Sequence, residues 1–252
     1  GLEINANQLS VKLRDGLDIP PTDFYLHLVQ AMDGQPDSGE IHANKIELLK
    51  FSRLMDYMPL RGGLREKLAE LAPQGEISAL RAKWQGLGEQ SSYEIRANFD
   101  DMSLRRSGSI PGFSGLSGSV NGNNNGGTVS LSSRMLTLDM PDYLVEPLAF
   151  DTLTMQAGWR MNNIGLEVTL NNAFLANADL AGTLSGSYQF RSGSRGQLDL
   201  SVHLPRLAVR QSARYIPHVV LGSTAHDWLG KALRDGQSDE FRLRLQGDLD
   251  NF

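Results

Sequence analysis

The sequence predicts a mainly β protein, a long antiparallel sheet that carries two pairs of short helices. Three observations support this fold class: many segments alternate apolar and polar residues, turn-forming residues separate those segments, and one pattern occurs twice along the chain. Alternation with a period of two gives each strand one apolar and one polar face. Because only a few turn residues separate neighbouring segments, we expect the strands to pair as antiparallel meanders.

The alternation is strongest from the middle of the chain to its end. It covers residues 93–99, 129–131, 136–138, 153–159, 166–170, 198–204 and 241–245. Turn-forming residues at 162–163, 171–172 and 193–196 are predicted to separate strands. Residues 121–127, an asparagine- and glycine-rich stretch, are predicted to form a loop tip because they are too polar and flexible to pack.

Helices are predicted at 50–58 and 64–72, and again at 209–216 and 224–234. In the last of these, Leu229 and Leu233 are expected to dock the helix onto the sheet, where it would cover an edge.

The two helical pairs belong to a repeat. Tyr57-Met-Pro59 recurs as Tyr215-Ile-Pro217, 158 residues later (215 − 57), and a glycine-to-glycine strand at 75–86 recurs at 236–247, 161 residues later (236 − 75). Such a period favours an array of similar units. We therefore predict that residues 1–86 end one repeat, with its helices near 46–72, and that 87–252 form a second, with its helices near 209–235. Both would lie in one continuous body.

Composition excludes several classes of function. The net charge of −5 gives no electrostatic basis for binding nucleic acid, and the absence of cysteine excludes disulfides and thiol catalysis. No apolar run approaches the ~20 residues of a membrane helix. Both ends fall within strand-like patterns, so we expect a segment of a longer chain, with any anchor or targeting signal outside it.

No pattern predicts catalysis, a metal site or a cofactor. None of the five histidines stands four residues from another, and no H-E-x-x-H sequence occurs. The stretch 112–116 lacks the second glycine of a nucleophile elbow. The acidic pairs Asp100-Asp101 and Asp248-x-Asp250 lack the spacing of a calcium loop and are expected to be solvated strand ends. We therefore predict a non-enzymatic protein.

The apolar side of the strands is the main feature left without a role. It either packs against a second sheet as a filled core or lines a surface for an apolar ligand. Periodicity alone favours the filled core.

Several segments together resemble the YhdP family of AsmA-like proteins from the Gram-negative envelope. They are residues 113–119, 126–133, 137–141, 146–151, 175–179, 181–186, 213–217 and 241–247, with Trp159 and the stretch around Trp228. The resemblance covers nearly the whole chain, and it rests on the order and spacing of these segments.

This resemblance implies a bridge-like lipid transfer protein, whose sheet curls into an open groove, apolar inside and polar outside. The implied partners are phospholipids, the inner membrane through an anchor outside this chain, and the outer membrane or its proteins at the far end. Nucleic acid is not among them. The implied location is the periplasm, in a protein anchored to the inner membrane.

Under this hypothesis the alternating apolar residues line the groove and contact acyl chains. They are Val129, Leu131, Leu136, Leu138, Leu153, Met155, Trp159, Leu166, Val168, Leu170, Leu198, Leu200, Val202, Leu204, Phe241, Leu243 and Leu245. Arg81, Lys83, Arg242 and Arg244 are expected on the wet outer face. The alternative hypothesis is a β-rich scaffold or interaction module of the envelope with a filled core. A glycan-binding protein is a third, disfavoured by the low aromatic content of 7%.

Overall fold

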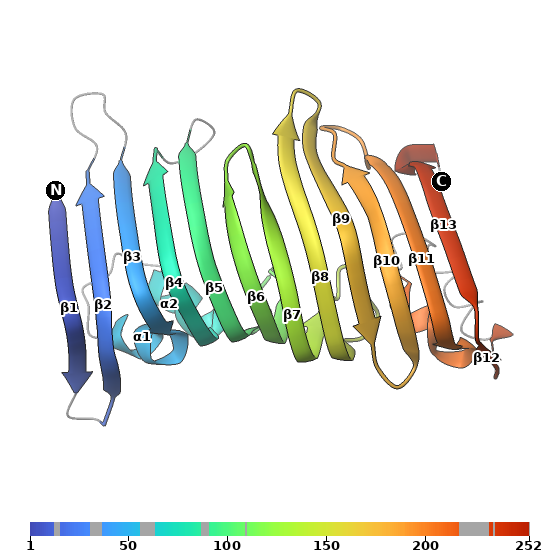
Figure 1. Ribbon diagram of the computed structural model, residues 1–252, viewed down its shortest axis with the longest axis horizontal. Helices are drawn as coiled ribbons and strands as arrows, with labels where there is room; N and C mark the ends of the chain where they lie inside the picture. Colours follow the sequence, from blue (N-terminus) through green and yellow to red (C-terminus); the bar gives the residue numbers. More distant parts are fainter. Residues whose placement is uncertain are drawn as a thin grey trace.

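One antiparallel sheet of 13 strands makes up most of the structure (Figure 1). The structure, a computed structural model, describes residues 1–12, 16–30, 37–55, 64–86, 91–108, 110–216, 232–233 and 235–251. Strands β1 to β12 each pair with the next strand in the sequence, and β13 pairs with β11. The sheet is not closed into a barrel, so the prediction of a mainly β protein with one long antiparallel sheet is confirmed.

The strands are long, and most of them run the full width of the sheet. Their bounds are β1 (Leu2–Lys12), β2 (Asp18–Val29), β3 (Ser38–Glu47), β4 (Gln74–Gln85), β5 (Ser92–Leu104), β6 (Gly112–Asn123), β7 (Gly126–Asp139), β8 (Leu148–Asn162), β9 (Gly165–Ala176), β10 (Leu180–Gln189), β11 (Gln197–Ala208), β12 (Gln237–Ser238) and β13 (Phe241–Asp248). Because β12 and β13 share one edge of β11, the sheet has twelve strand positions, and spacings of about 4.8 Å make it about 53 Å long.

The helices are short insertions between neighbouring strands. The helices α1 (Leu48–Met55) and α2 (Leu64–Leu71) connect β3 to β4, and the 3₁₀ helix η1 (Val209–Tyr215) follows β11. The last described element is a 3₁₀ turn, η2 (Leu249–Asn251). The predicted helix at 224–234, with Leu229, falls almost entirely outside the described residues, as does Tyr57 of the repeat. In both insertions, the chain leaves the sheet at the same end of the strands (Figure 1).

The predicted loop tip at 121–127 is confirmed at its centre but is shorter than expected. Strands β6 and β7 extend through it, and only Asn124 and Asn125 form the turn, where the Asn123 side chain accepts the N–H of Asn125 at 2.8 Å. The glycines in this stretch make room for a ring, because a Cβ added at Gly122 or Gly127 would lie 2.3 or 2.4 Å from the Trp159 side chain. They serve close packing under an aromatic ring, a use that composition alone does not reveal.

The predicted turn at Asn171-Asn172 was wrong, because these residues form a β-bulge inside β9. Asn172 lies opposite Gln156 of β8, but the next pair is Leu170 with Ala157, so β9 carries one extra residue. The alternation of β9 therefore changes by one residue at this point, and that change resembles the end of a strand in the sequence. Bulges bend a strand and increase its twist.

Bulges recur across the sheet and place several residues in left-handed backbone conformations. Gln8, Ala79, Asp101 and Met135 have φ angles of 52°, 50°, 47° and 53°. Asp101 thus lies inside β5 at a bulge, which corrects the expectation that Asp100-Asp101 is a strand end. A bulge bends the strand in which it lies, and the ribbons of Figure 1 are curved.

A buried serine satisfies one of these irregular positions. The Ser133 hydroxyl, only 1% exposed, accepts the N–H of Ser117 at 2.9 Å and donates to the Ser117 carbonyl at 3.3 Å. The Ser117 hydroxyl in turn accepts the N–H of Asp101 at 2.9 Å. Backbone groups at a bulge lose their strand partners, so these hydroxyls replace missing sheet hydrogen bonds.

We predict that Ser133→Ala lowers the free energy of unfolding by about 1–3 kcal/mol, because it leaves the Ser117 N–H without its partner inside the protein. The neighbouring substitution Ser132→Ala, at an exposed position of the same strand, is the control and should have little effect. Urea denaturation measures both. Equal effects of the two substitutions would contradict this role of Ser133.

Apolar residues at one end of the strands are covered by connecting segments. Leu136, Leu144, Leu148, Phe150, Leu180, Leu204 and Leu207 are buried together, and Tyr215 and Phe241 pack against them. Leu144 comes from the connection between β7 and β8, and Tyr215 comes from η1. We call this group the covered cluster. Figure 1 shows these connections behind the lower ends of the strands.

Candidate functional site

Cross-strand register places the predicted lining residues on one side of the sheet, here called the apolar face. Trp159 of β8 lies opposite Val168 of β9, and Leu200 of β11 lies opposite Leu245 of β13. Gly186 of β10 lies opposite both Leu200 and Leu170. Leu170 is two residues from Val168 on the same face of β9, so Gly186 links the two pairs. Directly opposite residues of antiparallel strands share a face. The remaining predicted residues join them through the same pairings or through the covered cluster. Their contact with lipid stays a prediction.

The bulges keep apolar residues on this face where simple alternation fails. In β7, Leu131 and Leu136 are five residues apart, so an unbroken period of two would put them on opposite faces. The left-handed residue Met135 shifts the alternation, and Leu136 lies opposite Phe150, with exposures of 1% and 5%. Both residues belong to the covered cluster.

One row of paired residues crosses the apolar face from β1 to β13 without a charged side chain. It consists of Ile4, Leu26, Ile41, Ala82, Ile95, Gly122, Gly127, Trp159, Val168, Tyr188, Leu198 and Gly247, each opposite the next. Tyr188 carries the row's one hydroxyl group, which donates to the carbonyl of Arg195 at 2.8 Å. The row shows that the apolar face is continuous along the sheet.

In the adjacent row, on the other side of the sheet, every residue except one glycine has a polar side chain. It consists of Glu3, His27, Glu40, Lys83, Glu94, Asn123, Gly126, Arg160, Glu167, Gln189, Gln197 and Asp248. Charges of opposite sign pair across strands, as in Arg160 with Glu167 at 2.8 Å. We call this side the polar face. The four basic residues predicted on the wet outer face are exposed on this side: Arg81, Lys83, Arg242 and Arg244. Each lies opposite a polar residue of a neighbouring strand.

The sequence reasoning missed about half of the apolar face. The missed residues include Leu2, Ile4, Leu26, Leu28, Ile41, Leu80, Trp84, Tyr93, Ile95, Phe99, Leu116, Val120, Leu184 and Tyr188. Phe24-x-Leu26-x-Leu28 carries the alternating signal and could have been found. In β6 and β10 glycines occupy apolar-face positions, so the alternation of large apolar residues is hidden there.

Away from the covered cluster, apolar-face side chains reach solvent. Leu2 and Ile4, which adjoin one another at the far end of β1, are 50% and 39% exposed, and Tyr93 at the same end of β5 is 43% exposed. Exposed large apolar side chains that adjoin one another are typical of surfaces that bind another molecule. The apolar face is therefore filled at one end of the strands and accessible at the other.

A polar contact fastens η1 to the covered end. The Tyr215 hydroxyl donates to the Asp179 carboxylate at 2.8 Å and accepts from the Asn177 side-chain amide at 2.8 Å. Arg214 bridges Asp179 at 3.3 Å and Glu146 at 3.0 Å. The cluster ties η1, the turn after β9 and the connection before β8 together over the apolar side chains.

Burial raises the pKa of Tyr215 to about 12, with a further contribution from its bond to Asp179. Since the folded-state pKa exceeds the ordinary value of 10.0, the associated stability is present below pH 10 and is lost as pH rises toward 12. We predict that stability falls more steeply over this range in the unmodified chain than in Tyr215→Phe. Urea denaturation at stepped alkaline pH tests this, and parallel curves would contradict it.

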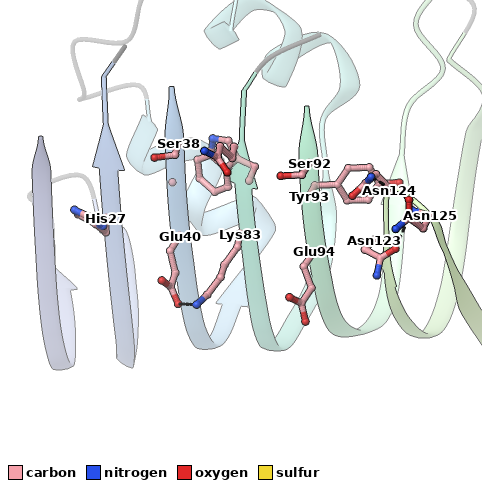
Figure 2. A pocket seen from close by; sticks show the side chains of 13 residues that line it. His27, Ser38, Glu40, Lys83, Ser92, Tyr93, Glu94, Asn123, Asn124 and Asn125 are labelled. Carbon is pink, nitrogen blue, oxygen red and sulfur yellow. Dashed lines mark hydrogen bonds and ion pairs between the residues drawn. The ribbon is translucent and has the colours of Figure 1, made fainter. Parts of the chain in front are cut away.

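The described hollows are lined by residues of both faces. One, of about 590 Å³, is lined by residues that include His27, Glu40, Lys83, Tyr93 and Glu94. Figure 2 shows Glu40 and Lys83 joined by their ion pair, which measures 3.0 Å. The Lys83 hydrogen bond holds the pKa of the Glu40 carboxyl below its usual range. Alternating charges and amides make this hollow a wet site, unsuited to a hydrocarbon chain.

A second hollow, of about 570 Å³, lies beside His203, Arg242 and Arg244. Arg244 contacts Asp199 at 3.2 Å, so its charge is partly neutralised. Across the described ranges, no three histidine, aspartate or glutamate side chains gather as they would around a metal ion. The described helices are all too short and too polar to span a bilayer.

Comparison with known proteins identifies the chain through its family. No curated protein and no solved structure matches it. The family model described as YhdP protein matches residues 1–252, the whole chain, which agrees with the resemblance of the individual segments. The chain therefore belongs to the YhdP protein family.

Proposed function

We propose that this chain is a non-enzymatic segment of a lipid conduit, whose apolar face shields phospholipid acyl chains between the inner and outer membranes. The observation that supports it is the pair of adjacent rows, one apolar and one polar, that run the length of the sheet. A general role in lipid transport also fits membership of the YhdP family.

The energetics favour such a surface. Exposing acyl chains to water costs about 0.8 kcal/mol per methylene, so a 16-carbon chain costs on the order of 12 kcal/mol. An apolar face removes much of that cost, while a head group stays in water. Because the apolar row carries no charged side chain, it has no charged group that would bind a lipid and slow the lipid's movement along the sheet.

A complete conduit would extend beyond this chain. The sheet is about 53 Å long, so several such units would be needed to cross a wider periplasmic space. An anchor in the inner membrane and a contact at the outer membrane would then lie in other parts of the protein.

The covered cluster favours a second candidate, a scaffold with a filled core. At that end, Leu136, Phe150 and Leu180 are buried by the chain's own connecting segments. If the accessible part of the apolar face were filled by another protein, the chain would hold partners together instead of lipids.

Mass spectrometry of solvent extracts from the purified chain separates the two candidates. A conduit segment should carry phospholipid, and should regain it from phospholipid vesicles after delipidation. A chain that is free of lipid when purified and takes up none from vesicles would contradict the conduit and support the scaffold.

A further inference from the structure

Aromatic residues are sorted by type along the strands of the apolar face. Trp84, Tyr93, Trp159 and Tyr188 lie within three residues of the ends of β4, β5, β8 and β10. All four lie at the same end of the sheet, opposite the covered cluster, because each of these strands has its other end beside the helices or connections there. We call these four residues the aromatic row.

Toward the covered end, the aromatic residues that the strands supply are phenylalanines. Phe150 belongs to the covered cluster, Phe241 packs against it, and Phe113 lies opposite Leu138. Tyr215 of η1 reaches the same region, but its hydroxyl is held by Asn177 and Asp179. Within the strands of the apolar face, tryptophan and tyrosine thus lie at the accessible end, and phenylalanine lies in the middle or at the filled end. Phe190, which follows β10 at the accessible end, lies outside the strands and is 47% exposed.

The two tryptophan rings lie flat against the sheet. A Cβ added at Gly39 would be 2.2 Å from the Trp84 ring, and one added at Gly122 would be 2.3 Å from the Trp159 ring. Trp84 therefore packs on the neighbouring strand β3, and Trp159 packs across β7 as far as β6, where glycines leave space. This packing fixes both rings at the accessible end of the apolar face.

Tryptophan and tyrosine have an apolar body and a polar tip, and they are enriched where hydrocarbon meets water at the level of lipid head groups. The tyrosines of the aromatic row fit this pattern. Tyr188 donates to the Arg195 carbonyl in the turn beyond its strand, and Tyr93 is 43% exposed beside the turn at Asn123–Asn125 (Figure 2). Phenylalanine lacks a polar tip and suits the hydrocarbon side of such a boundary.

We propose that the aromatic row sets the level of phospholipid head groups on this sheet, so that acyl chains run along the strands toward the covered cluster. This inference rests on the proposed function and adds the orientation of the lipid. Trp159 and Phe150 are nine residues apart, or about 30 Å at the rise of a strand. The acyl chains of one bilayer leaflet span about 15 Å, half the thickness of the hydrocarbon core. They therefore fit between the level of Trp159 and the level of Phe150.

Depth-dependent fluorescence quenching tests the orientation. The chain has three tryptophans, Trp84, Trp159 and Trp228. Two variants keep only Trp84 or only Trp159, with phenylalanine at the other two positions. A third replaces all three by phenylalanine and carries Phe241→Trp, and Phe113→Trp substitutes for it if that variant does not fold. The probes are phosphatidylcholines brominated near the carbonyl end or near the methyl end of one acyl chain.

We expect the carbonyl-end bromines to cause the larger fractional loss of fluorescence from Trp84 and Trp159. The methyl-end bromines should cause the larger loss from the tryptophan at position 241 or 113. Equal or reversed losses would overturn the orientation while leaving lipid binding intact. An absence of quenching at every position would overturn the proposed function as well.

Discussion

Replacing Leu170 and Leu200 together by aspartate is expected to reduce the phospholipid bound along β9 to β11 by more than about tenfold. Both residues lie opposite Gly186 on the apolar face. Covering a carboxylate with an acyl chain removes its hydration, which costs several kcal/mol. Each 1.4 kcal/mol lowers the affinity for the lipid about tenfold. Lipid mass spectrometry and uptake from vesicles measure the change.

A matched control is available one residue away on each strand. Thr169→Asp with Ser201→Asp adds the same charge to the polar face, because these residues alternate with Val168, Leu170, Leu200 and Val202. The control should keep its lipid and its melting temperature. Equal lipid loss in both double variants would show that charge or instability, and not the apolar face, determines the result.

Gly186→Ala is expected to destabilise the chain strongly. A Cβ at this position would lie 2.2 Å from the Asp199 carbonyl oxygen, a backbone atom of β11 that cannot move aside without distorting the sheet. Overpacking of this kind costs about 1–3 kcal/mol, and the rigidity of backbone favours the upper part of that range. For a chain of this size the melting temperature should fall by about 6–12 °C. Gly182→Ala should behave alike, since its Cβ would lie 2.1 Å from the His203 carbonyl oxygen.

Gly158→Ala is the control for these glycines. It lies inside β8, but the nearest atom to an added Cβ is 3.5 Å away, which is an ordinary contact. The substitution should be neutral or slightly stabilising, because alanine reduces the freedom of the unfolded chain. If the Gly158→Ala and Gly186→Ala variants melted at the same temperature, the close approach of β10 to β11 would not explain why residue 186 is a glycine.

The sheet could be predicted from sequence wherever large apolar residues alternate without interruption. Residues 153–159 and 198–204 do so, and the faces that they predict agree with the register of β8 and β11. The fold class needed only this signal, because successive strands joined by short connections form an antiparallel sheet in order.

Bulges and glycines account for most of what the sequence did not reveal. At Asn171-Asn172 an extra residue interrupts the alternation, and in sequence it cannot be told from a turn. At Gly122, Gly127 and Gly186 the apolar-face residue has no side chain, because a ring or a neighbouring strand occupies that space. Such positions depend on contacts between distant strands, which one sequence read along its length does not contain.

Photocrosslinking at adjacent residues of one strand tests the central claim most directly. A photoreactive amino acid at Val168 or Leu200 faces the apolar side, and the same residue at Thr169 or Ser201 faces the polar side. Arg242, opposite His203 on the polar face, is a further control. With radiolabelled phospholipid present, we predict labelled protein from positions 168 and 200 and none above background from 169, 201 and 242. Equal labelling from both faces, or none from Val168 and Leu200, would contradict the account.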